Sequence, residues 1–388
     1  MATTTTTTRR ARYGIVLPPW FSRAAAAVCI LIAIVYPFLF TQGDSWVNVA
    51  VLAWAYAVMA LGLNVMVGFA GLLDLGYLAF FAIGAYATGW FSSGFYADAN
   101  IHVGAGNFAS RLPGIHLNWL LVVILAMALC ALAGVIIGLP TLRLRGDYIA
   151  IVTLAFGEII RVFAVKGTDI HFGKDATLTA GRQGITPVDS IALPGGTPFN
   201  PLNLRPWYWV ALGMLFFTLF CNIRLRDSRL GRAWIAIRED EVAAASMGVP
   251  LVRTKLMAYA TGAAFGGMSG AFLGSYLNTV NADQFAFAFS IFVLAMIILG
   301  GIGSIWGVTL GAVALTLINF KLIPDVFNGL PGVFGLDFNL TDMSFGIFGF
   351  LLVIMMVLRP QGLLPERRRE LELEEGIGAD DQFVRVQA

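Results

Sequence analysis

Residues 224–255 read RLRDSRLGRAWIAIREDEVAAASMGVPLVRTK, one of the few long polar stretches in a chain that is otherwise strongly apolar. Seven residues of this stretch are basic: Arg224, Arg226, Arg229, Arg232, Arg238, Arg253 and Lys255. Loops on the cytoplasmic side of a membrane carry an excess of Lys and Arg. The stretch therefore predicts a cytoplasmic loop between two membrane-spanning helices, and it sets the orientation of the rest of the chain.

This loop carries the pattern of a short helix. Apolar residues such as Trp234 and Ile237 recur at helical spacing around an acidic cluster. Gly248 and Pro250 follow as stop signals. The pattern predicts one amphipathic helix, from about residue 231 to residue 247.

The loop also contains a surface suited to a partner protein. Ala243 to Ser246 are small residues followed by Gly248, so they form a low-relief surface on which a partner could dock. The alternative is an ordinary solvated loop, which is the usual role of a charge-rich stretch.

Composition places the chain among polytopic membrane proteins. Of its 388 residues, 58% are hydrophobic and 12% charged, and 43 glycines are spread through apolar segments. We therefore expect an all-α polytopic membrane protein in contact with the lipid bilayer. The net charge of +2, with the basic residues clustered at the predicted membrane surface, does not suggest a nucleic-acid partner. The three cysteines lie in apolar segments and give neither a disulfide framework nor metal-ligand spacing.

About ten apolar segments approach the roughly 20 residues that cross a hydrocarbon core. They cover residues 24–40, 46–68, 75–91, 119–139, 148–165, 207–223, 256–277, 286–301, 305–320 and 344–358. Alternation from the loop at 224–255 puts both termini in the cytoplasm. With this topology, 18 basic residues fall in cytoplasmic segments and 6 in external ones, which supports the orientation.

Three regions follow from this topology. Residues 1–23 form a cytoplasmic N-terminal tail, predicted to be disordered because the run at 3–8 is all threonine. Residues 24–358 form the transmembrane domain, with its cytoplasmic loop at 224–255, and residues 359–388 form a cytoplasmic C-terminal tail. The basic-then-apolar order at the N-terminus also fits a cleaved signal peptide, but no convincing cleavage site follows.

The loop resembles the cytoplasmic coupling loop of ABC importer permeases, whose pattern is Glu-Ala-Ala, three residues and Gly. Counted back from Gly248, the glutamate of this pattern falls on Val242, and Glu241 lies one residue earlier. Within the loop, the stretch GRAWIAIREDE (231–241) resembles more narrowly the permeases of branched-chain amino acid importers of the LivM type. Four more stretches agree with that family: GLNVMVGFAGLLDLGYLAFFAIGAYATG (62–89), LRGDYIAIVTLAFGEIIRV (144–162), LGGIGSIW (299–306) and RPQGLLP (359–365).

This resemblance implies an ABC importer permease fold in a bacterial cytoplasmic (inner) membrane. It also implies a complex with a second, homologous permease subunit, two cytoplasmic ATPase subunits and an extracytoplasmic solute-binding protein. The ATPase subunits would hold ATP and Mg, and this chain would carry no cofactor. The implied substrate is a small neutral amino acid (leucine, isoleucine or valine) moved inward. Urea or a short-chain amide, carried by close relatives in the same family, is the alternative.

The candidate site residues form two groups. Those expected to couple the loop to the ATPase are Arg238, Glu239, Asp240, Glu241, Ala243, Ala244 and Gly248. Those expected near the translocation path are Asn64, Asp74, Glu158 and Arg161. No residue is predicted to be catalytic or to bind a metal.

The path candidates are chosen for their place within apolar segments. Glu158 and Arg161 are three residues apart, hence on one helix face near mid-membrane. A lone charge there costs about 3 kcal/mol on insertion scales, so we expect the two to pair with each other or to face a wet cavity. An ion pair that locks two helices or subunits together is the alternative. Asn64 and Asp74 flank a glycine break, where they would line the path or hydrogen-bond a helix end.

Glycine-broken apolar segments occur in both halves, at 62–89 and at 262–274 with 300–311. In transporters such interruptions often line the substrate path, whereas for a single glycine close helix packing is the simpler interpretation. The external loop at 166–206 also contains a glycine-rich motif, LTAGRQGI (178–185). Its backbone could press against a ligand or docked protein, or it could be an ordinary surface turn.

Other classes of function lack their motifs. The only Gly-Lys pair, Gly173–Lys174, is followed by Asp175, so the sequence contains no phosphate-binding loop and active transport would need a separate ATPase. An intramembrane enzyme would need a nucleophile and base within the spans, but the three histidines all lie in the external loops at 92–118 and 166–206. A secondary transporter would share the spans, but it would have no reason to keep a capped helix in its cytoplasmic loop.

Overall fold

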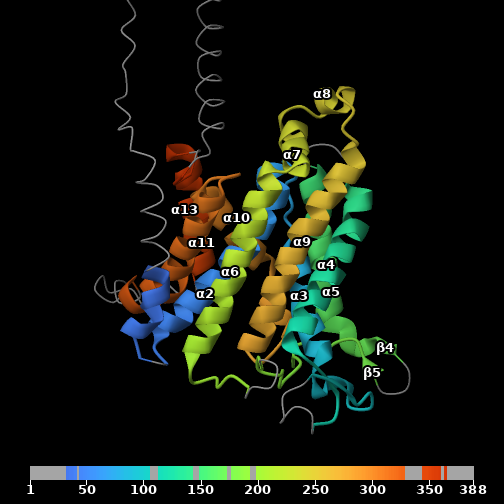
Figure 1. The fold of residues 1–388 in the computed structure, drawn as a ribbon, viewed down its shortest axis with the longest axis vertical. Coiled ribbons are helices and arrows are strands. Elements are labelled where there is room, and N and C mark those ends of the chain that lie inside the picture. Colours follow the sequence, from blue (N-terminus) through green and yellow to red (C-terminus); the bar gives the residue numbers. More distant parts are fainter. Residues whose placement is uncertain are drawn as a thin grey trace, which may run out of the picture.

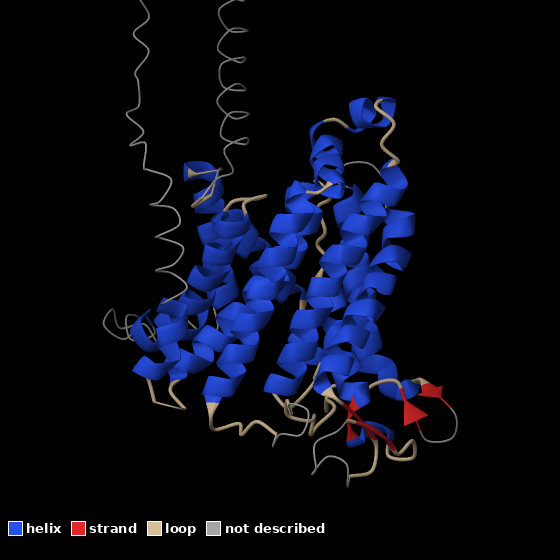
Figure 2. Cartoon of the chain, in the orientation of Figure 1, coloured by secondary structure: helices blue, strands red, loops and turns tan. Residues whose placement is uncertain are grey.

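Helices make up most of the protein in the computed structural model, which describes residues 32–41, 43–104, 112–142, 148–172, 176–192, 198–327, 343–359 and 362–364. The axes of most of the long helices are roughly aligned, and these helices pack side by side (Figure 1). Helix α8 stands at one end of this bundle, and the short strands lie at the opposite end (Figure 2). The predicted helical class is therefore confirmed for the bundle, and within the described ranges strands occur only in connections at one of its ends.

A helical segment at 32–39 precedes the other helices. The α-helices that follow are α2 Ser45–Asn64, α3 Leu78–Phe91, α4 Trp119–Thr141, α5 Tyr148–Lys166, α6 Leu204–Asp227, α7 Arg229–Glu239, α8 Glu241–Ser246, α9 Leu251–Tyr276, α10 Phe287–Gly300, α11 Ile305–Leu317 and α13 Ser344–Leu358. Two π-helices, η1 Val65–Phe69 and η6 Ile318–Phe327, continue α2 and α11. Short 3-10 helices are η2 Gly94–Tyr96, η4 Gly167–Asp169 and η5 Ala282–Phe285.

Among the described residues, six helical stretches are long and apolar enough to cross a membrane. They are Ser45–Phe69, Trp119–Thr141, Tyr148–Asp169, Leu204–Asp227, Leu251–Tyr276 and Ile305–Asp325. Three further apolar helices, Leu78–Phe91, Phe287–Gly300 and Gly346–Leu358, are shorter. The predicted count of about ten spans is thus not confirmed. The first predicted segment, at 24–40, lies mostly outside the part of the chain that the structure describes.

The short length of α3 and α10 has a structural cause. Each has 14 residues, or about 21 Å at 1.5 Å per residue, against a hydrocarbon core of about 30 Å. Both follow stretches that are not α-helical, namely segment 70–77 before α3 and η5 before α10. The predicted segments at 75–91 and 286–301 therefore agree with α3 and α10 to within three residues, and both helices are shorter than the hydrocarbon core.

Segment 70–77 is not helical beyond Ala70, whose N–H donates to the Val65 carbonyl oxygen of η1, and most of its residues are buried. Inside a membrane such backbone is tolerated only where protein or a water-filled cavity covers it. Here side chains take the place of helical partners: the Leu75 backbone N–H donates to Thr153 Oγ1 of α5 (3.1 Å), and the Gly76 N–H donates to Asp74 Oδ1 (2.8 Å). Segment 70–77 is consequently fixed by the helices around it.

Helix α9 lies at the centre of the bundle, where it packs against α2, α3 and α4. Glycines make these contacts close. A Cβ on Gly262 would lie 2.7 Å from the carbonyl oxygen of Gly62 in α2, and one on Gly84 in α3 would overlap the backbone of Gly267. The interpretation of these glycines as sites of close helix packing is confirmed.

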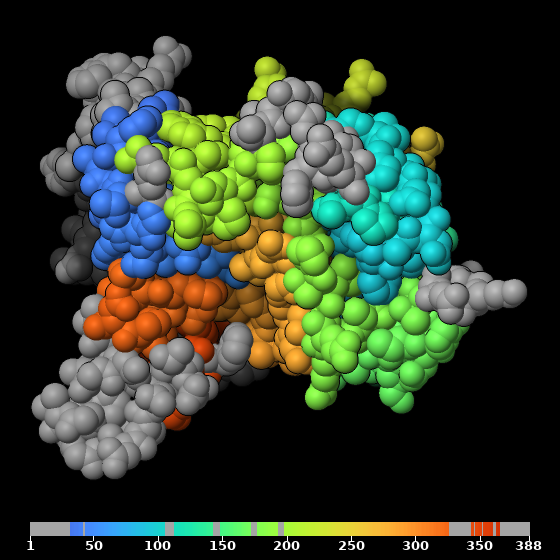
Figure 3. Space-filling view, turned by 90° about the horizontal axis from the view of Figure 1, so that it is seen from below, coloured from blue at the N-terminus to red at the C-terminus, as the bar shows by residue number. Residues whose placement is uncertain are grey.

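The end of the bundle opposite α8 is covered by connections that contain every named strand. Strands β1 Ser92–Ser93, β2 Ile101–Val103 and β3 Ile115–Leu117 form one sheet in the order β1-β3-β2, with β1 antiparallel and β2 parallel to β3. Strands β4 His171–Phe172 and β5 Ala176–Thr177 form an antiparallel pair. Figure 3 looks at this end and shows the cyan and green residues of the two regions gathered on the same side.

The glycine-rich motif at 178–185 packs against its own chain at this end. The backbones of Ile185 and Val280 exchange two hydrogen bonds, of 2.9 and 3.1 Å. Gly184 has a φ of +77°, and a Cβ there would lie 3.0 Å from the Val280 carbonyl oxygen. The motif therefore attaches the α5–α6 connection to the segment between α9 and η5, and this close contact accounts for Gly184.

We predict that Gly84→Ala destabilises the bundle, because the new Cβ would overlap the Gly267 backbone and push α3 away from α9. The apparent melting temperature in detergent should fall. Gly213→Ala in α6 is the matched control: a Cβ there meets nothing within 4 Å, and helix propensity favours Ala by about 1 kcal/mol. Equal melting temperatures for the two variants would contradict the close α3–α9 contact.

A second prediction concerns orientation. In a background without the native cysteines, Asp98→Cys and Leu202→Cys should react with a membrane-impermeant thiol reagent in intact cells, since both residues are exposed in connections at the strand end. Met247→Cys, which is exposed beside α8, should react only after permeabilisation. The reverse labelling pattern would invert the proposed topology.

Candidate functional site

The loop between α6 and α9 is anchored to the bundle through α7. Ser228 caps the start of α7, where its side chain accepts a hydrogen bond from the Gly231 N–H (3.2 Å). Trp234 is fully buried, and its Nε1 donates to the Thr254 carbonyl oxygen at the start of α9 (2.8 Å). The amphipathic pattern seen in the sequence therefore corresponds to a helix whose apolar face packs on the bundle.

The predicted single helix over 231–247 is in fact two helices, α7 and α8, divided at Asp240. Asp240 has extended backbone geometry, with φ −154° and ψ 110°. Its Oδ1 accepts hydrogen bonds from Val242 N (2.8 Å) and Ala243 N (3.0 Å), as an N-cap residue does. The acidic cluster contained this signal, because aspartate favours a helix N-terminus over a helix interior.

Helix α8 stands at one end of the bundle (Figure 1), and apolar side chains in and beside it are exposed. The side chains of Val242 and Met247 are 76% and 86% exposed, and Ala243 is also exposed, whereas Ala244 is buried. Gly248 has a φ of +85°, and nothing lies within 4 Å of the position that a Cβ would occupy. The loop thus combines a buried anchor in α7 with an uncovered, low-relief surface on α8.

Two charged residues hold α8 and α7 against the bundle from opposite sides of Asp240. Glu241 Oε1 lies 2.7 Å from Lys255 Nζ at the start of α9. The Arg238 guanidinium turns inward and donates to the carbonyl oxygen of Gly68 in π-helix η1, which continues α2. The sequence did not indicate Lys255 as the partner of Glu241, because the two are fourteen residues apart in the chain.

The predicted coupling residues therefore form two groups, one exposed to solvent and one facing the transmembrane helices. Glu239, Glu241 and Ala243 are exposed, as is Gly248, while Ala244 is buried and Arg238 points into the protein. The exposed members lie where a partner could contact them. The inward members hold the loop to the transmembrane helices.

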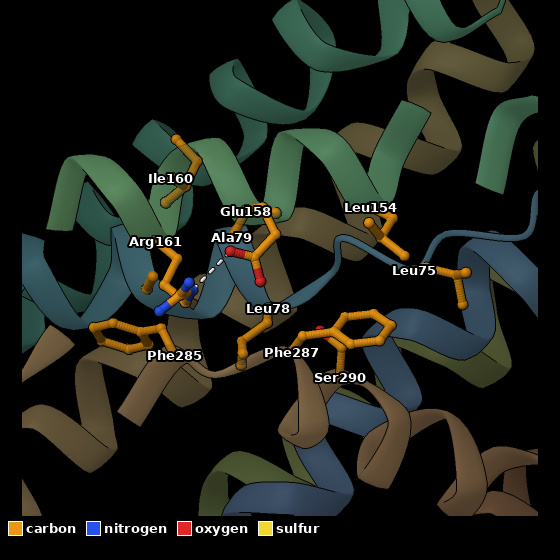
Figure 4. A pocket seen from close by; sticks show the side chains of 12 residues that line it. Leu75, Leu78, Ala79, Leu154, Glu158, Ile160, Arg161, Phe285, Phe287 and Ser290 are labelled. Carbon is orange, nitrogen blue, oxygen red and sulfur yellow. Dashed lines mark hydrogen bonds and ion pairs between the residues drawn. The ribbon is translucent and has the colours of Figure 1, made fainter. Parts of the chain in front are cut away.

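The second candidate region lies on α5, where Glu158 and Arg161 form an ion pair. Arg161 Nε donates to Glu158 Oε2 at 2.7 Å. Figure 4 shows both side chains directed toward α3 and the start of α10, where Leu78, Phe285 and Phe287 face them. The cavity between these elements has a volume of about 10 Å³, and its lining also includes Leu75, Leu154 and Ser290. The sequence analysis missed Ser290, a polar residue within an apolar helix.

The exposure of this ion pair limits what can cover it. The Arg161 and Glu158 side chains are 36% and 37% exposed. A charged residue facing lipid at mid-membrane is strongly unfavourable, so charged side chains in spans face a bundle interior, a polar cavity or another protein. The exposed face of α5 is therefore suited to contact a second protein or a water-filled path.

The other two path candidates occupy the central break. Asn64 Oδ1 accepts from the Gly303 N–H (2.9 Å), and Asn64 Nδ2 is buried without a hydrogen-bond partner among the described residues. Asp74 is buried and accepts from Gly76, whose backbone packs against Thr153 and Gly157 of α5. The structure thus places Asp74 beside Thr153 of α5, five residues before Glu158, whereas Asn64 contacts the turn between α10 and α11.

Neither region contains a metal-binding constellation: within the described ranges, no three or more His, Cys, Asp or Glu residues are grouped to hold a metal ion. The two regions offer an ion pair on an apolar helix and exposed apolar side chains at α8.

Comparison with known proteins identifies relatives over most of the chain. Residues 45–356 match the family described as branched-chain amino acid transport system / permease component. The high-affinity branched-chain amino acid transport system permease proteins LivM of Salmonella typhimurium and of Escherichia coli K12 are each 37% identical to this chain, with 91% of this chain and 77% of the relative covered. The permease protein LivH of the same system in Salmonella typhimurium is 23% identical, with 82% of this chain and 93% of the relative covered. No solved structure matches the chain.

Proposed function

This chain belongs to the branched-chain amino acid transport system permease family, and from that premise we propose that it is the transmembrane permease subunit of an ATP-driven ABC importer. Its substrates would be leucine, isoleucine and valine, moved inward across a bacterial cytoplasmic membrane. Both termini would be cytoplasmic, with residues 24–358 forming the permease domain between tails at 1–23 and 359–388.

The observation that carries the coupling role is the uncovered surface of α8. Val242 and Met247 expose large apolar side chains there, although the loop around them is well ordered by Asp240 and by the Glu241–Lys255 pair. Exposed apolar surface on an otherwise fixed loop is typical of a site of protein contact. We assign this surface to one of two cytoplasmic ATPase subunits, whose bound ATP and Mg would supply the energy.

The proposed complex also contains a second permease. LivM and LivH relatives of this chain carry the name of one and the same transport system, which supports a pair of homologous permeases. The half-exposed ion pair on α5 is consistent with this arrangement, because a second subunit across a shared path would shield it from lipid. An extracytoplasmic binding protein would deliver substrate to the strand end of the bundle.

The Glu158–Arg161 pair is suited to guide a zwitterion. An α-carboxylate would be attracted to Arg161 and an α-ammonium to Glu158, while Leu78 and Phe287 provide apolar contact for an aliphatic side chain. The cavity of about 10 Å³ has room for little more than a water molecule, so the path must widen before an amino acid passes. Asn64 and Asp74 remain candidates at the neighbouring break.

Two alternatives differ in their requirements. Urea or a short-chain amide lacks the two charges, so its passage would not depend on Arg161. A secondary transporter would have no use for an ATPase-docking surface on α8.

We predict that the complex reconstituted with its binding protein accumulates labelled leucine, but not labelled urea, only when ATP is supplied. Arg161→Gln should lower leucine uptake by at least about tenfold, because losing a charge-assisted hydrogen bond costs about 1.5–3 kcal/mol. The neighbouring Ile159→Leu, on an exposed part of α5, is the control and should leave uptake unchanged. Urea accumulation without leucine would contradict the substrate, and uptake without ATP would contradict the ABC class.

The docking surface has its own test in the Glu241–Lys255 pair. Glu241→Lys places two positive charges together and should displace α8, so less ATPase subunit should co-purify with the permease. The exchange variant Glu241→Lys with Lys255→Glu restores the attraction and should recover binding. If Glu241→Lys alone binds the ATPase normally, or the exchange recovers nothing, the ion pair does not position the docking surface.

A further inference from the structure

Three of the motifs that resemble the family are joined by contacts beside π-helix η1, which packs against the inward face of α7, although they lie far apart in the chain. They are the stretches at 62–89, 299–306 and 359–365, and neither the docking surface nor the α5 ion pair accounts for this convergence. The contacts are made at one level of the bundle, at the end that carries α8.

Arg238 makes the first contact. Its Nη1 donates to the carbonyl oxygen of Gly68, within π-helix η1 at the end of α2. The last carbonyl groups of a helix lack intrahelical partners, so a guanidinium at this position satisfies a group that would otherwise be buried and unpaired. The stem of Arg238 also covers Gly71, where a Cβ would lie 2.7 Å from Arg238 Cγ.

The α10–α11 turn makes the second contact with the same π-helix. Asn64 Oδ1 accepts from the Gly303 N–H at 2.9 Å, and a Cβ on Gly68 would lie 2.8 Å from that same nitrogen. Segments of the two halves of the chain thus touch beside the carbonyl that Arg238 binds.

The stretch at 359–365 supports this turn from its other side. Leu363 N donates to the Leu299 carbonyl oxygen (2.8 Å), and Leu364 N donates to that of Gly300 (3.1 Å). Gly362 packs on Gly301, where a Cβ would lie 2.5 Å from the Gly301 Cα. These residues belong to the predicted C-terminal tail, yet they bind the end of α10.

On the other side, the π-helix leads directly to the candidate path. It runs into segment 70–77, whose Leu75 N–H binds Thr153 and whose Gly76 packs against Gly157, the residue before Glu158. A continuous set of contacts therefore runs from α8 through Asp240, α7 and Arg238 to segment 70–77 and the ion pair on α5. π-helical turns within α-helices often occur at functional sites, because they interrupt regular hydrogen bonding.

We propose that Arg238 is a positioning residue that transmits movement of the α7–α8 loop to π-helix η1 at the end of α2. From η1 the movement would pass through segment 70–77 to the path on α5. This inference rests on the proposed coupling role of the loop. Arg238 acts from inside the protein, so it sets the position of segment 70–77 without contacting the ATPase. The turn at 301–303, held by residues 362–364, is the fixed support against which η1 moves.

Labelling of a single cysteine tests the contact without any partner. Leu73 lies in segment 70–77 and is 39% exposed. In purified permease without native cysteines, Arg238→Gln should change the reaction rate of Leu73→Cys with a thiol reagent by at least about fivefold, the lower end of typical coupling effects. Arg232→Gln, at an exposed arginine on the same helix, is the matched control and should leave the rate unchanged. An unchanged rate in Arg238→Gln would overturn the proposal.

Transport by the full complex tests the consequence. Arg238→Gln should keep ATPase subunits bound and hydrolysis within about twofold, while leucine uptake per ATP falls at least about fivefold. Arg238→Lys should recover part of the uptake, because an ammonium can still donate to the Gly68 carbonyl. Normal uptake per ATP in Arg238→Gln, or loss of uptake only together with loss of ATPase binding, would overturn the proposal. Failure of the unsubstituted complex to bind an ATPase or take up leucine would instead refute the proposed function, and the labelling rates would still decide the role of Arg238.

Discussion

Every backbone polar group inside a membrane must find its hydrogen-bond partner within the protein. This constraint bears most strongly on segment 70–77, which interrupts helical structure in the middle of the bundle. Thr153 of α5 and Asp74 of the segment itself accept hydrogen bonds from its backbone, and Arg238 of α7 satisfies the carbonyl of Gly68 just before it. The helices that surround the break are therefore tied to it, and the break cannot change its shape without affecting them.

Glycine makes this arrangement possible at the level of packing. The close approach of Gly62 and Gly262, and of Gly76 and Gly157, brings backbones together around the break. Tyr77 adds a hydrogen bond from its hydroxyl to the Gly262 carbonyl oxygen (2.8 Å). Without a hydrophobic driving force between helices in lipid, such contacts and interhelical hydrogen bonds are what hold a bundle together.

Two surfaces of the chain expose groups that are unfavourable in their surroundings. Apolar side chains at α8 are exposed, and α5, a helix long and apolar enough to cross a membrane, exposes an ion pair. Each surface is unfavourable in the solvent that it would meet alone. The complex that we propose for this chain would account for both, since its other subunits would cover the first surface and share the second.

Much of this protein follows from its sequence alone, because the properties concerned depend on local spacing and composition. Apolar length predicts the membrane class, the three-residue spacing of Glu158 and Arg161 predicts their ion pair, and Gly248 marks the end of the helical loop. The five quoted stretches point to the family without any structure.

The tertiary structure alone decides which of these local features meet. Its contributions are the division of the loop at Asp240, the pairing of Glu241 with Lys255, the inward turn of Arg238, and the contact of Gly68 with Gly303. These contacts join residues through the crossing of helices, and the positions of those crossings depend on how the whole bundle packs.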